Sequence, residues 1–187
     1  MSIPALTIDG VLPPHTGNPT DPCGVSPYVS GVMEFCQQFG TTSERRVILL
    51  GWLRLRDVLR QAGFTDTFQW VDGSFLEDVE RNEGRAPRDV DVVTFFWPSS
   101  PAFAATVAAG FPTLIDHDAT KSQFLVDHYF EDLSFHPART VGRAAYWNSL
   151  FSHRRDDLRK GMLQIELGPA ADDDAARQFL QSLPPAP

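Results

Sequence analysis

Two aspartates separated by one residue, Asp89 and Asp91, begin a run of β-branched and aromatic residues and could bind a cation together. Successive side chains of a β-strand point to opposite faces, so both carboxylates project to the same side. Carboxylates held that close repel each other unless a cation lies between them. The apolar flanks predict a central strand that carries acid into a cleft, and an exposed edge strand facing water is the alternative. A hard divalent ion, bound by one or two carboxylates and by substrate phosphates, suits such a site.

A turn of small residues, Gly73-Ser74, precedes this strand and ends another one that begins near Phe68. Glycine lets the backbone approach a phosphate closely, and free N–H groups at such a turn bind anions. Taken alone, the turn is equally an ordinary connection between a strand and a helix. Because it lies at the same end of the sheet as the aspartate pair, the combination predicts a phosphate-binding turn.

A Gly-Ser turn at a strand end, followed by Asp-x-Asp on the next strand, resembles the signature of the nucleotidyltransferase superfamily with the DNA polymerase β-like catalytic fold. The resemblance covers residues 43–167. Within the superfamily, the chain looks most similar to small bacterial nucleotidyltransferase-like proteins, some of which act in toxin–antitoxin or phage-defence systems. It implies that Gly73 and Ser74 contact the triphosphate and that Asp89 and Asp91 bind Mg²⁺ or Mn²⁺. Fourteen residues separate Ser74 from Asp89, slightly more than is usual, so the intervening loop is enlarged.

The superfamily pattern also implies a third acid on a later strand, and Asp127 is the best match for it. Glu131 shares its strand parity and stays an alternative. The third acid would bind a second metal ion and orient the acceptor hydroxyl for in-line attack. Arg154 and Arg155 are candidates for binding the triphosphate, because guanidinium groups pair with phosphate oxygens. A solvated basic turn is the alternative interpretation of these two arginines. The role of Lys121 is open.

Charge is unevenly distributed along the 187 residues, whose net charge is −8. Six basic residues against two aspartates give the segment 136–160 a local charge of +4. Acid that binds metal beside base that binds phosphate is the division expected of a nucleotide site, and it also occurs on unrelated surfaces. The overall negative charge argues against a broad DNA-binding surface, because neutralising phosphates requires clustered Lys and Arg.

Composition and length favour one globular domain, residues 26–187, behind an irregular Pro- and Gly-rich arm, residues 1–25. No apolar run approaches the roughly 20 residues of a membrane span. With no secretory signal and only two cysteines, we expect a cytoplasmic protein that does not associate with membranes.

Hydrophobic periodicity and turn residues predict a strand-rich centre surrounded by helices. The arginines of the second helix are expected on its solvated face, and 77–88 is expected to be a loop. We expect helices at 26–40, 43–63, 99–110, 139–152 and 172–183, and strands at 68–71, 90–97, 123–130 and 162–167. The fold class is therefore α+β (or α/β), with a mixed β-sheet of about four to five strands flanked by helices and a polymerase β-like nucleotidyltransferase core.

The expected function is Mg²⁺-dependent transfer of a nucleoside monophosphate from an NTP to an acceptor hydroxyl. By the resemblance, the acceptor is a tRNA, a protein or a small molecule, and a cognate antitoxin or other partner protein is conceivable. The alternative is a nucleotidyltransferase-fold binding module that has lost its chemistry and acts through a partner protein, because a fold does not imply an activity.

Overall fold

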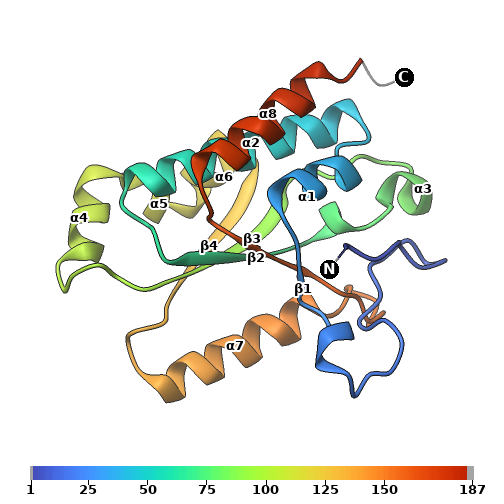
Figure 1. Cartoon of the computed structure of the whole chain (residues 1–187), viewed down its shortest axis with the longest axis horizontal. Coiled ribbons are helices and arrows are strands. Elements are labelled where there is room, and N and C mark those ends of the chain that lie inside the picture. Colours follow the sequence, from blue (N-terminus) through green and yellow to red (C-terminus); the bar gives the residue numbers. More distant parts are fainter. Residues whose placement is uncertain (1, 185–187) are drawn as a thin grey trace.

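A five-stranded mixed sheet forms the centre of the computed structural model, which describes residues 2–184 (Figure 1). The strand order is β1-β5-β2-β3-β4, which confirms the expected α+β class and mixed sheet. The strands are β1 (Tyr28–Val29), β2 (Thr67–Asp72), β3 (Val90–Phe96), β4 (Val126–Asp132) and β5 (Leu163–Glu166). The helices are α1 (Val32–Phe39), α2 (Ser43–Gln61), α3 (Val79–Glu83), α4 (Phe103–Gly110), α5 (Pro112–Ile115), α6 (His117–Phe124), α7 (Pro137–Phe151) and α8 (Ala170–Ser182), with 3₁₀ turns at Pro22–Gly24 and Ser74–Leu76.

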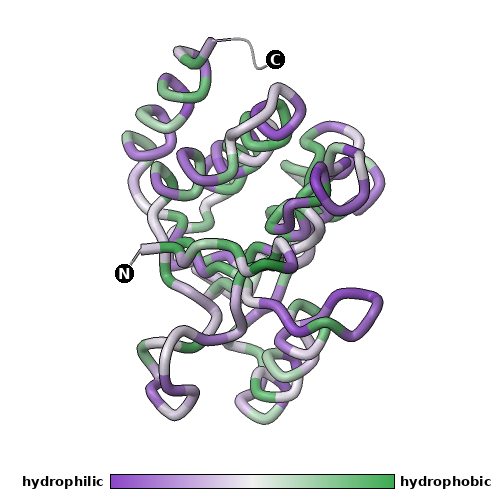
Figure 2. The backbone as a smooth tube through the Cα atoms, turned by 90° about the vertical axis from the view of Figure 1, so that its right-hand side faces the viewer, coloured by the Kyte–Doolittle hydropathy of each residue, from purple (hydrophilic) through white to green (hydrophobic). Residues whose placement is uncertain are grey.

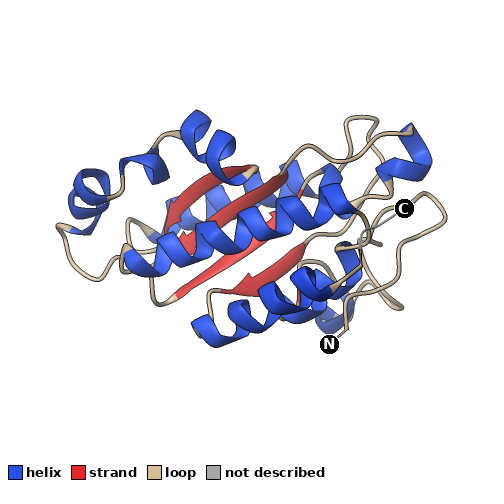
Figure 3. Cartoon of the chain, turned by 90° about the horizontal axis from the view of Figure 1, so that it is seen from above, coloured by secondary structure: helices blue, strands red, loops and turns tan. Residues whose placement is uncertain are grey.

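Helices cover the two faces of the sheet unequally. α1, α2 and α8 lie over one face, whereas α7 lies on the other face (Figures 1 and 3). Seen from the side, hydrophobic and hydrophilic residues alternate along the helices, as burial of one helix side requires (Figure 2). The larger core lies beneath α1 and α2 and includes the fully buried Trp52 and Phe35. A smaller cluster packs Trp147 and Phe151 of α7 against Val93 and Phe95 of β3.

Two arginines of α2 are buried, so the prediction of a wholly solvated arginine face was wrong. Arg45 is 4% exposed and Arg56 is 0% exposed. Arg45 donates to the carbonyl oxygen of Phe75 at 2.7 Å and pairs with Glu80 at 2.6 Å. A long aliphatic stem packs well in a core, and the guanidinium is tolerated there only when every donor finds an acceptor. Periodicity could not identify those acceptors because they lie on other elements.

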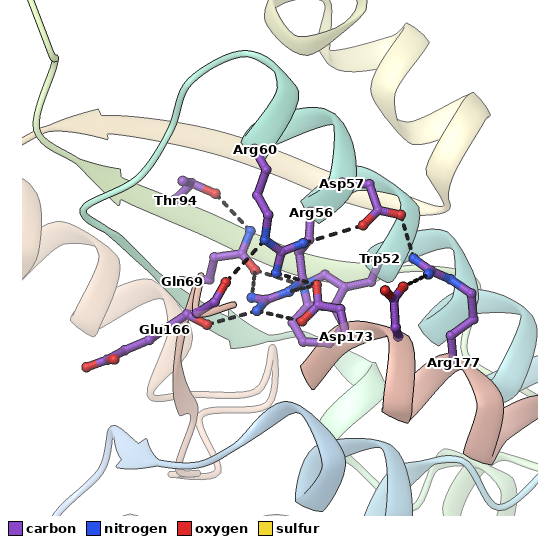
Figure 4. Close-up of polar contacts among 11 residues, drawn as sticks. Trp52, Arg56, Asp57, Arg60, Gln69, Thr94, Glu166, Asp173 and Arg177 are labelled. Atoms are coloured by element: carbon purple, nitrogen blue, oxygen red, sulfur yellow. Dashed lines mark hydrogen bonds and ion pairs between the residues drawn. The ribbon is translucent and has the colours of Figure 1, made fainter. Parts of the chain in front are cut away.

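The partners of Arg56 form a buried network that joins α2, α8 and the sheet (Figure 4). Its guanidinium donates to both carboxylate oxygens of Asp173, at 2.8 and 3.0 Å, and to Gln69 Oε1 at 3.1 Å. Gln69 in turn donates to Thr94 Oγ1 at 3.1 Å, which contacts His128 Nε2 at 2.7 Å. Burial lowers the pKa of His128 to about 3, which keeps the imidazole neutral. The network fixes the register between the helix layer and the strands.

Several element boundaries differ from the prediction. The first helix begins at Val32 rather than at 26, because Tyr28–Val29 pairs with β5 as a short parallel strand. The third predicted strand begins at Val126, since the preceding residues complete α6 and Leu125 ends that helix with φ of 57°. The enlarged loop at 77–88 contains the short helix α3. Each difference arises from pairing or capping that local composition does not encode.

Aromatic residues, and not the smaller apolar ones, lie on the buried side of α7. Val141 is 70% exposed and Leu150 is 51% exposed, whereas the aromatic Trp147 and Phe151 are buried. Large aromatic side chains bury more apolar area than valine or alanine, so they set the orientation of the helix.

The N-terminal arm lies against the domain. Ile3, Val11 and Leu12 are at most 5% exposed, and Gly161 donates to the carbonyl oxygen of Leu12 at 2.8 Å. Among the described residues, no helix combines the length and the apolar character needed to span a membrane.

Candidate active site

Strand register brings three aspartates from three neighbouring strands into one row. β2 and β3 are antiparallel and place Asp72 opposite Asp91, while β3 and β4 are parallel and place Asp91 beside Asp127. Residues paired across strands project to the same face, so the three carboxylates meet at one end of the sheet on the α7 side. Asp89 immediately precedes β3 and joins the same end. We call Asp72, Asp91 and Asp127 the acid row.

The predicted turn at Gly73 lies directly against the acid row. Gly73 has φ of 86°, a backbone conformation that favours glycine. A Cβ atom added at Gly73 would lie 2.0 Å from Asp91 Oδ2, well inside van der Waals contact. The missing side chain therefore makes room for the Asp91 carboxylate and for whatever that carboxylate binds. After this residue, Ser74–Leu76 forms a short 3₁₀ turn that leads away from β2.

A buried lysine, Lys160, anchors the turn to its strand. Its Nζ donates to the carbonyl oxygen of Gly73 at 3.1 Å and pairs with Asp72 Oδ2 at 3.1 Å and Glu77 Oε1 at 2.8 Å. Burial by itself would lower the pKa of this ammonium, but the two carboxylates outweigh burial and raise it. Burial raises the pKa of Asp72, and the Lys160 charge counteracts that effect. Lys160 thus neutralises one end of the acid row and fixes the backbone of the turn.

A second lysine, Lys121 of α6, lies at the opposite end of the row. Its Nζ is 2.8 Å from Asp89 Oδ2 and 3.0 Å from Asp127 Oδ2. Hydrogen bonding to Asp89 raises its pKa, so the group is charged. The side chain is 42% exposed, in contrast to the buried Lys160.

Asp91, in the middle of the row, has no cationic side chain within 4.0 Å in the described part of the chain. Burial raises its pKa to about 6, and repulsion from Asp127 and Asp89 adds to the increase. Two buried carboxylate oxygens, Asp72 Oδ1 and Asp127 Oδ1, accept no hydrogen bond from residues 2–184. His117 Nε2 lies 3.1 Å from Asp127 Oδ1 without hydrogen-bond geometry. Carboxylates outnumber the lysine ammonium groups here, so this end of the sheet favours an added cation.

These residues line a cleft of about 1290 Å³. Every residue proposed from the sequence for the site borders it, namely Gly73, Ser74, Asp89, Asp91, Asp127, Arg154 and Arg155. Arg154 pairs with Asp156 at 3.0 Å and lies 3.8 Å from Glu77. Glu131, the alternative third acid, does not border the cleft and instead accepts from Trp147 Nε1 at 2.6 Å. The geometry therefore favours Asp127 over Glu131.

The donor chemistry suits a hard divalent ion, although the carboxylates are not gathered into a preformed centre. Within residues 2–184, no three His, Cys, Asp or Glu side chains are grouped closely enough to hold a metal ion. Lys121 lies between Asp89 and Asp127, two of the three acids proposed as ligands. Carboxylate oxygens without partners, the glycine cradle beside Asp91 and the excess of negative charge all fit Mg²⁺ bound together with a phosphate ligand.

The sequence analysis did not identify three residues that shape the site, Asp72, Glu77 and Lys160. Asp72 could have been found, because it has the same strand parity as Phe68 and Trp70 and directly precedes Gly73. Lys160 carried no local signal, since its partners are more than eighty residues away in sequence.

The fold and cleft define an α+β protein with an acidic, lysine-bordered site at one end of a mixed sheet. The chain belongs to a family of unknown function, DUF6932, whose pattern it matches over residues 4–166. The matched region contains the whole acid row and both lysines. No curated protein and no solved structure matches the chain.

Proposed function

We propose that this protein is an Mg²⁺-dependent nucleotidyltransferase with a polymerase β-like core, which moves a nucleoside monophosphate from an NTP to an acceptor hydroxyl. The observation that carries the proposal is the acid row beside Gly73. The Asp91 carboxylate occupies the space that a side chain on residue 73 would need. A phosphate-binding turn and a set of carboxylates short of cations then share one cleft. We propose a tRNA, a protein or a small molecule as the acceptor, and a toxin role with a cognate antitoxin.

Each side chain has a defined part in this proposal. The backbone N–H groups after Gly73 bind the triphosphate, and Lys160 holds that backbone against β2. Arg154 and Arg155, which also line the cleft, supply positive charge. When bound, Mg²⁺ supplies Lewis-acid stabilisation of the charge on the phosphates. Asp91 and Asp89 would hold the ion that accompanies the nucleotide.

The transfer itself is an in-line displacement. The acceptor oxygen forms a bond to the α-phosphorus, and the bond from that phosphorus to the bridging oxygen of the β-phosphate breaks. Pyrophosphate leaves with the electron pair of that bond. Asp127, which lines the cleft, orients the acceptor hydroxyl and takes its proton. Phosphoryl chemistry depends mainly on such positioning and charge stabilisation, which a preorganised cleft can provide.

Thermal melting tests the proposal without requiring an acceptor. Mg²⁺ together with an NTP should raise the melting temperature more than either component alone, because the complex binds only the folded protein. Asp91→Ala should abolish the shift. Incubation with labelled NTPs and cell extract should then label an acceptor with the intact protein and not with the variant. Equal melting shifts for both proteins would refute the site. A shift without labelling would favour the binding module acting through a partner protein.

A further inference from the structure

Lys121 occupies an unusual position for a cationic side chain in a site built to bind cations. Its ammonium bridges Asp89, which directly precedes β3, and Asp127 of the neighbouring strand β4, at 2.8 and 3.0 Å. These are the distances of strong charge-assisted hydrogen bonds. An ammonium ion presents compact positive charge to oxygen acceptors, much as a small hard cation does. The two acids that Lys121 bridges are therefore already neutralised in part by the chain itself.

The fold holds this lysine at a nearly fixed distance from Asp127. α6 ends when Leu125 donates to the carbonyl oxygen of Lys121 at 2.9 Å, and β4 begins one residue later. Thr120 and Phe124 are at most 2% exposed and fix the helix on its inner side. Lys121 and Asp127 thus belong to one short, anchored helix-to-strand unit, and the ammonium stays near the row although its side chain is partly exposed.

The occupation of the row is asymmetric. Lys160 forms an ion pair with Asp72 at one end, and Lys121 forms one with Asp127 at the other. Asp91, between them, forms no ion pair within the described part of the chain. The side of Asp91 that faces Gly73 is also where the triphosphate would lie. One position in the row is therefore open to an ion, and it is the position next to the nucleotide.

We propose that Lys121 is a built-in cation that takes the place of a second divalent ion on the acceptor side, so that the site binds a single divalent ion together with the nucleotide. This inference rests on the proposed function. Asp127 then acts on the acceptor hydroxyl as a hydrogen-bonding group fixed by Lys121. Lys121 is a positioning residue in this arrangement. The divalent ion would be held by Asp91, by the Asp89 oxygen that Lys121 does not contact and by the triphosphate.

Counting bound Mn²⁺ tests the inference independently of activity. The full-length chain, saturated with a non-hydrolysable NTP analogue, is titrated with Mn²⁺ while free ion is followed by electron paramagnetic resonance. We expect one ion per chain for the intact protein and two for Lys121→Met, since removal of the ammonium frees oxygens of Asp89 and Asp127. Lys121→Arg should retain a count of one, because it keeps the positive charge.

A matched control removes a different positive charge from the same cleft. Arg85 borders the cleft but pairs with Glu83 at 2.7 Å and contacts none of the acid row, so Arg85→Met should also bind one ion. Two ions on the intact protein, or one ion on Lys121→Met, would overturn the role of Lys121 and leave the nucleotidyltransferase proposal standing. No bound ion on the intact protein would overturn both. A second ion in Arg85→Met as well would show that net charge alone sets the count, and would also overturn the assignment to Lys121.

Discussion

Two groups of charged residues lie on opposite sides of the same sheet and differ in how completely their charges are matched. In the buried network, Arg56 and Asp173 are both 0% exposed, and the arginine also reaches Gln69. In the cleft, carboxylates outnumber lysines, and Asp91 has no cation among the described residues. A buried ion pair with satisfied donors and acceptors holds elements together, whereas unmatched charge in an open cleft costs stability that a ligand can restore. The contrast separates charge that holds the fold together from charge that the proposed site leaves unmatched.

The largest expected effect on stability comes from breaking the buried network. Asp173→Ala leaves the guanidinium of Arg56 buried without its carboxylate and should lower the free energy of unfolding by about 3–5 kcal/mol. Urea denaturation measures the change. The neighbouring Asp174, whose side chain is 57% exposed and pairs with Arg177 on the surface, provides the control. Asp174→Ala should cost no more than about 1 kcal/mol. Similar losses for both variants would show that burial does not distinguish the pairs.

A smaller effect is expected at the turn that borders the unmatched charges. Gly73→Ala places a Cβ against Asp91 Oδ2 and imposes a side chain on a backbone with φ of 86°. It should cost about 2–3 kcal/mol and abolish the melting shift produced by Mg²⁺ with an NTP. Gly84 also has a positive φ, of 64°, but a Cβ there meets nothing within 4 Å. Gly84→Ala should cost only about 1 kcal/mol and keep the shift. Retention of nucleotide binding by Gly73→Ala would contradict the proposal that the missing side chain of Gly73 makes room for the Asp91 carboxylate and its ligand.

Removing an unmatched charge should raise the free energy of unfolding, whereas the two preceding substitutions lower it. Because the pKa of Asp91 is raised to about 6, the folded protein binds this proton more tightly than the unfolded chain does. Asp91 therefore lowers stability as pH rises from about 4 through 6, by on the order of 3 kcal/mol once deprotonated. Metal-free Asp91→Asn should be more stable than the intact protein at pH 8 and equally stable near pH 4, while losing nucleotide transfer. Asp89→Asn should also abolish transfer with the fold intact.

The difference between the two denaturation curves across pH is the quantity to measure. The lowered pKa of His128 acts in the other direction, since it favours the folded state increasingly as pH rises from about 3 to 6.5. This contribution is common to both proteins and cancels in the difference. A difference that does not change with pH would refute the interpretation of Asp91.

The smallest effect on stability is expected at Arg154 and Arg155, the two neighbouring arginines that line the cleft. Arg154→Ala should change the free energy of unfolding by no more than about 0.5 kcal/mol, since its partner Asp156 is largely exposed. It should nevertheless weaken NTP binding, and more so at low salt, because partly exposed charges are screened. Titration of the Arg154→Ala/Arg155→Ala double variant with an NTP at two salt concentrations measures this. Wild-type affinity at both concentrations would show that the segment is a solvated turn.

The sequence by itself determined the candidate site to a large extent. Parity placed Asp89 and Asp91 on one side of a strand, and the Gly-Ser turn located the neighbouring strand end, because both are local consequences of strand geometry. The helix at 43–63 and the four longer strands followed from periodicity with small errors at their ends. The acid at Asp127 came from a resemblance, and only strand register placed it beside Asp91.

The charge balance was decided by the tertiary structure alone. Lys160 reaches the row from more than eighty residues away in sequence, and α2 buries Arg56 against an acid that lies more than one hundred residues away. An arginine or lysine looks the same in a sequence whether it is solvated, paired in a core or bordering a cleft. Its role depends on which acceptors the fold brings within hydrogen-bonding distance, and such long-range pairing leaves no local pattern in the chain.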